Sequence, residues 1–119
     1  MGDLTSHFSR HEFACRCGCG FDTVDIILAD LCELARIIAG EYPVKVRSGC
    51  RCPTHNQAVG GSALSQHMYG RAADLEVRNP KEVYEELCYR FPARYGFGLY
   101  SDFIHIDSRT NGPSRWERM

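Results

Sequence analysis

Residues 72–107, AADLEVRNPKEVYEELCYRFPARYGFGLYSDFIHID, decide the fold class of this chain. The stretch opens with residues 72–77, a mostly apolar run that predicts a strand. The tetrapeptide NPKE at 79–82 supplies a cap residue, a helix-starting proline and an acidic third position, so a helix follows. Residues 96–100 and 103–107 predict two more strands with a tight link between them. The stretch therefore combines a strand, a helix and two further strands.

The chain upstream adds one long helix and one short strand. Apolar residues recur at three- and four-residue steps over residues 23–39, which predicts a helix with one buried face. Residues 44–47 alternate apolar and polar, which predicts a strand, and residues 53–58 permit a helical turn. The whole order predicts a small single α+β domain whose antiparallel sheet is flanked by helices. We expect residues 1–21 to be a Cys-rich N-terminal arm on the domain formed by residues 22–119.

The composition is that of an ordinary globular domain. The chain has 119 residues, of which 44% are hydrophobic and 24% charged, and its formal net charge is −1. This length fits one domain, and the lack of a basic excess argues against a nucleic-acid partner. No long apolar run is present, so we expect no membrane insertion, and we expect a monomer. The chain shows no secretory signal peptide, so we expect synthesis in the cytoplasm.

Three side chains have the chemistry of a catalytic zinc site. Such a site needs three protein ligands from His, Asp, Glu or Cys and an open position for water. His67, Asp74 and His105 can supply the three ligands, because Gly70 permits a tight reversal between the first two. On the last predicted strand, His105 and Asp107 share one face. The same residues are also compatible with an ordinary role as hydrogen-bonded histidines and strand-edge carboxylates.

Four blocks of the sequence resemble peptidase family M15. Residues 65–74, SQHMYGRAAD, and residues 102–105, DFIH, are similar to the metal motif of that family. Residues 48–56, SGCRCPTHN, resemble its Ser-Gly-aromatic-Arg-Ser-Pro segment, and residues 8–18 are similar to the opening of a compact, phage-type branch. The resemblance spans roughly residues 8–109, and it implies the fold shared by the Hedgehog domain and the DD-peptidases.

The resemblance assigns a role to each matching position. It implies one catalytic zinc ion, whose ligands would be His67, Asp74 and His105. Asp102 occupies the position of the catalytic carboxylate, and Arg51 that of the arginine that binds the substrate carbonyl. Ser65 matches a serine that supports substrate or ligand geometry, and Asp107 could hold an imidazole in one tautomer.

The implied activity is metal-assisted hydrolysis of an amide bond in peptidoglycan stem peptides or muropeptides. The bond is either that of a D-Ala-D-Ala carboxypeptidase or that of an L-Ala-D-Glu endopeptidase. The alternative is a non-catalytic zinc-binding module of the same fold. Phage lysis or another export route would bring the enzyme to the cell wall. We expect Arg109, Arg115 and Arg118 to lie in a solvated tail that could attract the anionic wall.

The seven cysteines predict no second metal site. Cys15, Cys17 and Cys19 alternate, and they lack the two-residue separation that is usual in structural zinc sites. We therefore expect free thiols. Two alternatives stay open: a disulfide between arm and body, and a metal site formed through glycine turns. Such a site would be completed by a residue of the set Cys32, Cys88, His7 and His11.

Two further cysteines flank the implied substrate-binding arginine. Cys50 and Cys52 stand where an aromatic residue and a serine are commoner in the family, and they could modulate the site or simply pack. A thiol hydrolase built on either of them with His55 would also need an orienting acid, and none is evident near them in the sequence.

Overall fold

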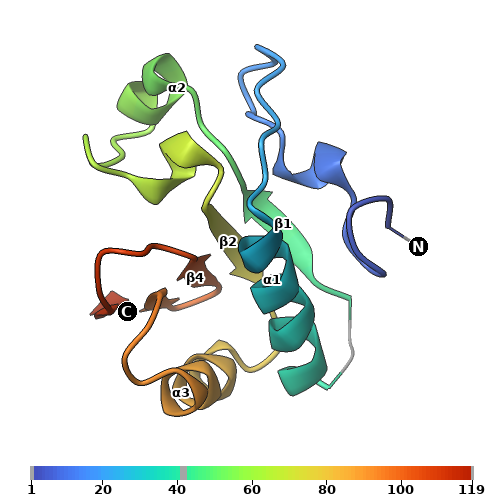
Figure 1. The fold of residues 1–119 in the computed structure, drawn as a ribbon, viewed down its shortest axis with the longest axis vertical. Coiled ribbons are helices and arrows are strands. Elements are labelled where there is room, and N and C mark those ends of the chain that lie inside the picture. Colours follow the sequence, from blue (N-terminus) through green and yellow to red (C-terminus); the bar gives the residue numbers. More distant parts are fainter. Residues whose placement is uncertain (1, 41–42, 119) are drawn as a thin grey trace.

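One mixed sheet organises the chain, and its strand order is β1-β2-β4-β3-β5 in the computed structural model, which describes residues 2–40 and 43–118 (Figure 1). The strands are β1 (Lys45–Ser48), β2 (Ala72–Glu76), β3 (Gly96–Tyr100), β4 (Ile104–Asp107) and β5 (Ser114–Arg118). Neighbouring strands are antiparallel except β3 and β5, which are parallel. The predicted α+β class with a largely antiparallel sheet is confirmed.

Within residues 2–40 and 43–118, three α-helices accompany the sheet. They are α1 (Ile26–Ile38), α2 (Pro53–Ala58) and α3 (Pro80–Arg90), and two short 3-10 turns are η1 (Arg10–Phe13) and η2 (Gln66–Tyr69). Helices α1 and α3 contact each other and the sheet, whereas α2 lies near η2 at the other end of the molecule (Figure 1). Among the described residues, no helix has the length and apolar character needed to cross a membrane.

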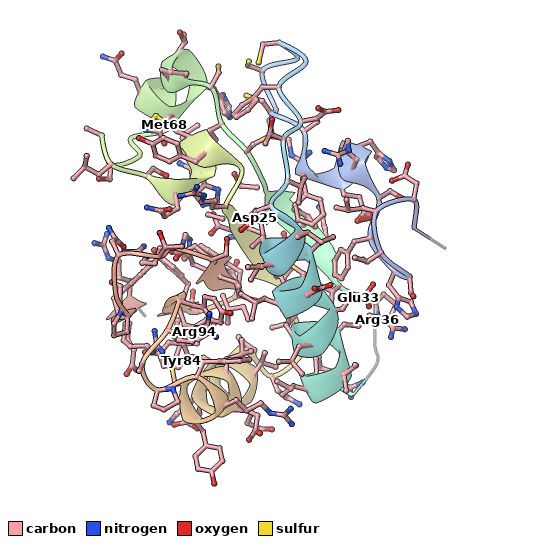
Figure 2. All side chains as sticks on the ribbon, viewed as in Figure 1. Asp25, Glu33, Arg36, Met68, Tyr84 and Arg94 are labelled. Carbon is pink, nitrogen blue, oxygen red and sulfur yellow. The ribbon has the colours of Figure 1, made fainter. Side chains whose placement is uncertain are left out.

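Helix α1 starts later than its apolar pattern predicts. The pattern begins near Thr23, but the backbone is still extended at Asp25, with φ −68° and ψ 133°. Asp25 is labelled at the start of the α1 ribbon in Figure 2. The Asp25 N–H donates to the carbonyl of Gly70, and its carboxylate accepts a 2.5 Å hydrogen bond from the Ser108 hydroxyl. These tertiary contacts keep the segment extended, so the helix begins at Ile26.

The hydrophobic core lies between the helices and one face of the sheet. Ile104 and Ile106 of β4 point into it, as their alternation with His105 predicts. The N-terminal arm contributes Phe8 and Phe13, whose exposed fractions are 1% and 0%. Burying each of these rings contributes roughly 1.5–3 kcal/mol, so the arm is part of the domain's stability.

Strand β5 was not expected. Residues 114–118 read as a charged tail, yet they form an edge strand beside β3. The Arg115 guanidinium donates to the carbonyls of Phe91, Arg94 and Tyr95. These bonds use main-chain acceptors from distant residues, so the sequence pattern of the strand alone carries no sign of them.

Candidate metal centre and substrate pocket

The strand register places the candidate ligands in one row across the sheet. Asp74 of β2 pairs with His105 of β4, which pairs with Gly98 of β3, which in turn pairs with Trp116 of β5. The imidazole of His105 therefore lies between a carboxylate on one side and a residue without a side chain on the other. Trp116 fills the space above Gly98, and its ring centroid lies 4.8 Å from that of His105.

His67 reaches the same row from turn η2. The Ser65 hydroxyl accepts a hydrogen bond from the His67 N–H at 3.2 Å, which caps the turn. Gly70 ends the turn with φ +68°, a backbone conformation that favours glycine. The Nδ1 atom of His67 lies 2.5 Å from the carbonyl oxygen of Gly49, so Nδ1 carries the proton and donates it.

The donor atoms of these residues converge. One donor atom from each of His67, Asp74 and His105 lies within 4.8 Å of the others. The Nε2 atom of His67 is buried and, among the described residues, has no hydrogen-bond partner, although it lies 3.3 Å from Oδ1 of Asp74. A buried unprotonated nitrogen beside a carboxylate costs free energy unless a cation binds between them. The set of two imidazoles and one carboxylate fits zinc.

The charges of the centre are coupled. Burial opposes ionisation of Asp74, but its hydrogen bond with His105 and the adjacent His67 imidazole outweigh it and hold the pKa of Asp74 well below its usual range. Burial disfavours a charged His105, but its contacts with Asp107 and Asp74 outweigh that effect and raise its pKa. Without a metal, a proton lies between Nδ1 of His105 and Oδ1 of Asp74, and these two atoms are 3.0 Å apart. A metal ion can take the place of this proton.

Asp107 holds the other side of the His105 ring. Its Oδ2 lies 2.7 Å from Nε2 of His105 and also accepts from Nη2 of Arg109 at 2.7 Å. Burial opposes ionisation of Asp107, but hydrogen bonds with Arg109 and His105 lower its pKa. Gly96 makes the room, because a Cβ atom there would lie 2.3 Å from the Asp107 carboxylate. Asp107 thus contacts the nitrogen of His105 that faces away from Asp74.

Arg51 lies beside the centre with unused donors. Its Nη1 donates to Oδ1 of Asn56 at 3.1 Å, and its Nη2 lies 3.8 Å from Oδ2 of Asp74. Its Nε is buried and, within the described chain, has no hydrogen-bond partner. Burial lowers the pKa of this guanidinium, and Asp74 partly offsets the effect. Gly61 packs so closely that a Cβ atom there would lie 2.7 Å from Nη1.

A pocket of about 410 Å³ opens over these groups. His67, Asp74, His105, Arg51 and Ser65 line it, so five of the seven expected site residues meet at one cavity. Four further residues were not expected at the site: Asn56, which bonds to Arg51, and Gly61, Tyr100 and Trp116, which line the pocket. Asn56 stood inside a matched block, which was an available signal, whereas Trp116 enters through the unexpected strand β5.

Asp102 and Asp107 are the two expected residues that do not line this pocket. Asp107 lies behind the His105 ring, whereas Asp102 lies farther away. It lies in the turn between β3 and β4, and its carboxylate accepts from Nη2 of Arg47 at 2.9 Å. Arg47 lines an adjoining cavity of about 400 Å³, which Asp74 and Arg51 also line. Asp102 is therefore linked to the edge of the site by its bond with Arg47 and does not line either cavity.

The sheet and its His-Asp-His donor set define a small α+β domain with a candidate metal centre. Residues 6–107 match the family described as Peptidase M15. A segment of 43 residues, 36% of this chain, is 53% identical to a zinc D-Ala-D-Ala carboxypeptidase of Streptomyces albus G. That match spans 17% of the relative's length. The chain belongs to the peptidase M15 family.

Proposed function

We propose that this chain is a zinc-dependent peptidase that hydrolyses an amide bond in peptidoglycan stem peptides. The observation that carries the proposal is the buried, unpartnered Nε2 of His67, which faces Asp74 and His105 beside the pocket. Membership of the peptidase M15 family and the partial relative named as a zinc D-Ala-D-Ala carboxypeptidase support it.

His67, Asp74 and His105 would hold the ion. When bound in such a site, zinc supplies Lewis acidity and lowers the pKa of the water in its open position. Gly49 and Asp107 keep the two imidazoles in fixed orientations through their second nitrogens. This preorganisation keeps the donor atoms in place before the ion arrives.

Arg51 is proposed to bind the carbonyl oxygen of the scissile amide. Its guanidinium has a buried unpaired N–H and lies close to Asp74, so it is positioned to stabilise negative charge that develops on that oxygen. Asn56 holds the guanidinium in this orientation.

Asp102 is proposed to move the proton. Its hydrogen bond with Arg47 lowers its pKa, so it is ionised at neutral pH and able to accept a proton from water. Its side chain is 66% exposed, and to act at the pocket it would have to turn away from Arg47. It would then return the proton to the leaving amine. Asp107 is an unsuitable base because it is fully buried and bound to both His105 and Arg109.

The pocket suits an acidic peptide. Arg51, Arg109 and Arg118 all line it, and stem peptides carry carboxylates. We infer that the bond cleaved is either the terminal D-Ala-D-Ala bond, as in the name of the partial relative, or the L-Ala-D-Glu bond. One contact favours a second candidate function, a non-catalytic zinc-binding module. The pairing of Asp102 with Arg47 keeps the proposed base outside the pocket.

Digestion of purified peptidoglycan, with mass spectrometry of the products, tests the proposal. Zinc-loaded protein is expected to release either free D-Ala or fragments cut after L-Ala. His67→Ala is expected to lose both the zinc and the products, whereas Glu85→Gln, an exposed change on α3, is expected to retain them. Wild-type protein that holds zinc but yields no product would support the non-catalytic module instead.

A further inference from the structure

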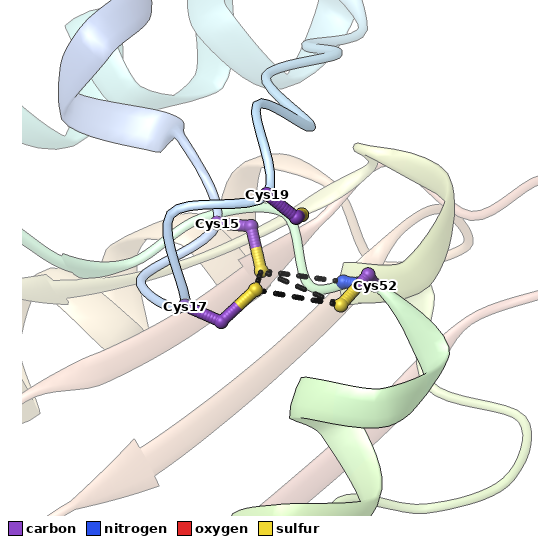
Figure 3. Close-up of side chains that lie close together, drawn as sticks. All are labelled: Cys15, Cys17, Cys19 and Cys52. Carbon is purple, nitrogen blue, oxygen red and sulfur yellow. Dashed lines mark hydrogen bonds between the residues drawn. The ribbon is translucent and has the colours of Figure 1, made fainter.

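Four cysteine sulfurs gather away from the His-Asp-His centre. Cys15, Cys17 and Cys19 come from the loop that follows η1, and Cys52 immediately precedes α2 (Figure 3). The Sγ atoms of Cys15 and Cys17 are 3.4 Å apart, and those of Cys17 and Cys52 are 3.7 Å apart. The Sγ atoms of Cys15 and Cys52 are 3.9 Å apart, and all four sulfurs lie within 4.8 Å of one another.

These separations match the edges of a metal-centred tetrahedron. Four sulfurs that each lie about 2.3 Å from a zinc ion are separated from one another by about 3.8 Å. A disulfide would require about 2.05 Å, and all seven cysteines are free thiols. The cluster therefore has the spacing of a tetrathiolate site rather than that of a bridge.

Two glycines explain how alternating cysteines can converge. Gly18 and Gly20 have φ of +82° and +90°, and the space around a Cβ atom at either position is open, so backbone conformation alone requires glycine there. The Cys15 N–H donates to the Phe21 carbonyl at 2.8 Å, which closes the loop. The loop is therefore not extended, and the three cysteine side chains can approach a common centre.

The residues that the sequence suggested as a fourth ligand lie elsewhere. Cys32 is fully buried in the hydrophobic core, and His7 is bonded to Glu33. Cys50 is also engaged, because its thiol donates to the carbonyls of Phe13 and Phe21. In the part of the chain that the structure describes, Cys52 completes the set.

Main-chain donors point at two of the sulfurs. The Cys52 N–H donates to Sγ of Cys15, and the His55 N–H donates to Sγ of Cys52, both at 3.4 Å. N–H donors aimed at sulfur are the contacts that a metal-bound cysteine sulfur accepts. Several thiolates this close repel one another strongly unless a cation binds among them.

We propose that Cys15, Cys17, Cys19 and Cys52 bind a second zinc ion in a closed, structural site. All four positions are filled by protein, so this site has no open coordination position for catalysis. The proposal replaces the expectation of a single ion, which rested on spacing within the arm and did not include Cys52.

The second site would fasten the N-terminal arm to the substrate-binding segment. Cys52 directly follows Arg51, and the Cys50 N–H donates to the Phe13 carbonyl at 2.8 Å. Gly49, which accepts from His67, packs so tightly that a Cβ atom there would lie 2.4 Å from the Phe13 carbonyl oxygen. The ion would thus hold together the segment that orients both His67 and Arg51.

Cobalt titration of the reduced, metal-free full-length chain tests this proposal independently of the peptidase activity. Thiolate ligands give Co²⁺ a charge-transfer absorption that imidazole and carboxylate do not give. The wild type is expected to bind two equivalents of Co²⁺ and to show this band. His67→Ala should retain the band with one equivalent, and Cys17→Ser/Cys52→Ser should lose it.

Controls separate the outcomes. Cys88→Ser changes a half-buried thiol on α3 outside the cluster and is expected to leave the band unchanged. The single variant Cys17→Ser, at an exposed position, should weaken Co²⁺ binding at this site by more than about tenfold. Absence of the band in the wild type, or a mass lower by two hydrogens that reveals a disulfide in metal-loaded reduced protein, would overturn the proposal.

Discussion

Asp102 and Arg47 form an ion pair across the sheet edge, with 2.9 Å between Oδ2 and Nη2. The same guanidinium donates to Glu76 at 3.0 Å, and its carbon lies 4.3 Å from the centre of the Phe103 ring. Arg47 is therefore fixed by two further contacts, whereas the carboxylate of Asp102 contacts Arg47 through both of its oxygens. If Asp102 serves as the base, this pair must open in each catalytic cycle.

Asp102→Asn is expected to retain zinc and to lose nearly all hydrolysis. General acid–base catalysis contributes roughly 10²–10⁴-fold in rate, and the amide cannot accept the proton. Zinc content by mass spectrometry and kcat on peptidoglycan fragments measure the two effects separately. Full activity in this variant would assign the base to another group.

Arg47→Ala is expected to shift the acid limb of the pH–rate profile to higher pH. Arg47 lowers the pKa of Asp102, so its removal lets that pKa rise toward the ordinary aspartate value. Asp102 then becomes protonated, and inactive as a base, at a higher pH than in the wild type. Arg47→Lys keeps a positive charge and should shift the limb less. An unchanged limb would show that this pair does not control the base.

Asp107→Asn is expected to weaken zinc binding about 10–100-fold, the usual effect of losing a carboxylate that orients a ligating histidine. The change leaves the shape of the side chain intact and removes the charge that faces Nε2 of His105. Competition with a zinc chelator measures the affinity. Asp30→Asn, an exposed change on α1, is the matched control and should have no effect.

Gly61→Ala is expected to lower kcat/KM by about tenfold while zinc binding is preserved. The new Cβ atom would lie 2.1 Å from Oδ1 of Asn56 and 2.7 Å from Nη1 of Arg51, so the guanidinium must move. Steady-state kinetics on a synthetic stem peptide give the value. Ala63→Ser changes an exposed residue of the same loop and should behave as the wild type. Equal kinetics in both variants would contradict the role given to Arg51.

Glu33→Gln is expected to destabilise the protein near neutral pH by about 1.5–3 kcal/mol, the range for a hydrogen bond to a charged group. The Glu33 carboxylate accepts from the His7 N–H at 2.7 Å and contacts its Nδ1 at 2.8 Å. Burial opposes its ionisation, but the neighbouring Thr5 and the hydrogen bonds with His7 outweigh that effect and lower its pKa.

The sign of the pH dependence follows from that lowered pKa. The folded state binds this proton more weakly than the unfolded chain, so the stabilisation is present above the unfolded pKa of about 4.3. It is lost as pH falls through the lower folded value. Urea unfolding between pH 7 and pH 3 should therefore show a smaller loss for Glu33→Gln than for the wild type. Exposed Glu85→Gln should follow the wild-type curve.

The sequence predicted local elements well because local signals determine them. Helix α3 begins at Pro80, as the NPKE motif predicts, and strands β1, β2 and β4 differ from their predicted ranges by no more than one residue at either end. Helix α1 begins later than expected because Gly70 and Ser108, far along the chain, hold Asp25 extended. Strand β5 depends on distant carbonyl acceptors, which no local pattern reveals.

The same contrast between local signals and distant contacts applies to the residues of the candidate site. His67, Asp74 and His105 could be named because their residue types and motif are specific, and the structure brings them together. The orientation of the Asp102 side chain could not be predicted, because it depends on Arg47 of a strand 55 residues away. The sulfur cluster was missed because its fourth member, Cys52, belongs to a different segment from the other three.

The register of β2 against β4 has a kinetic consequence. Asp74 and His105 are 31 residues apart in sequence, and they meet only when these two strands pair. Ion capture at this centre should therefore be a late event in folding, since long-range strand pairing is slow. Stopped-flow refolding with a fluorescent zinc indicator would then measure when β2 pairs with β4, because the time of zinc uptake would report the time of strand pairing.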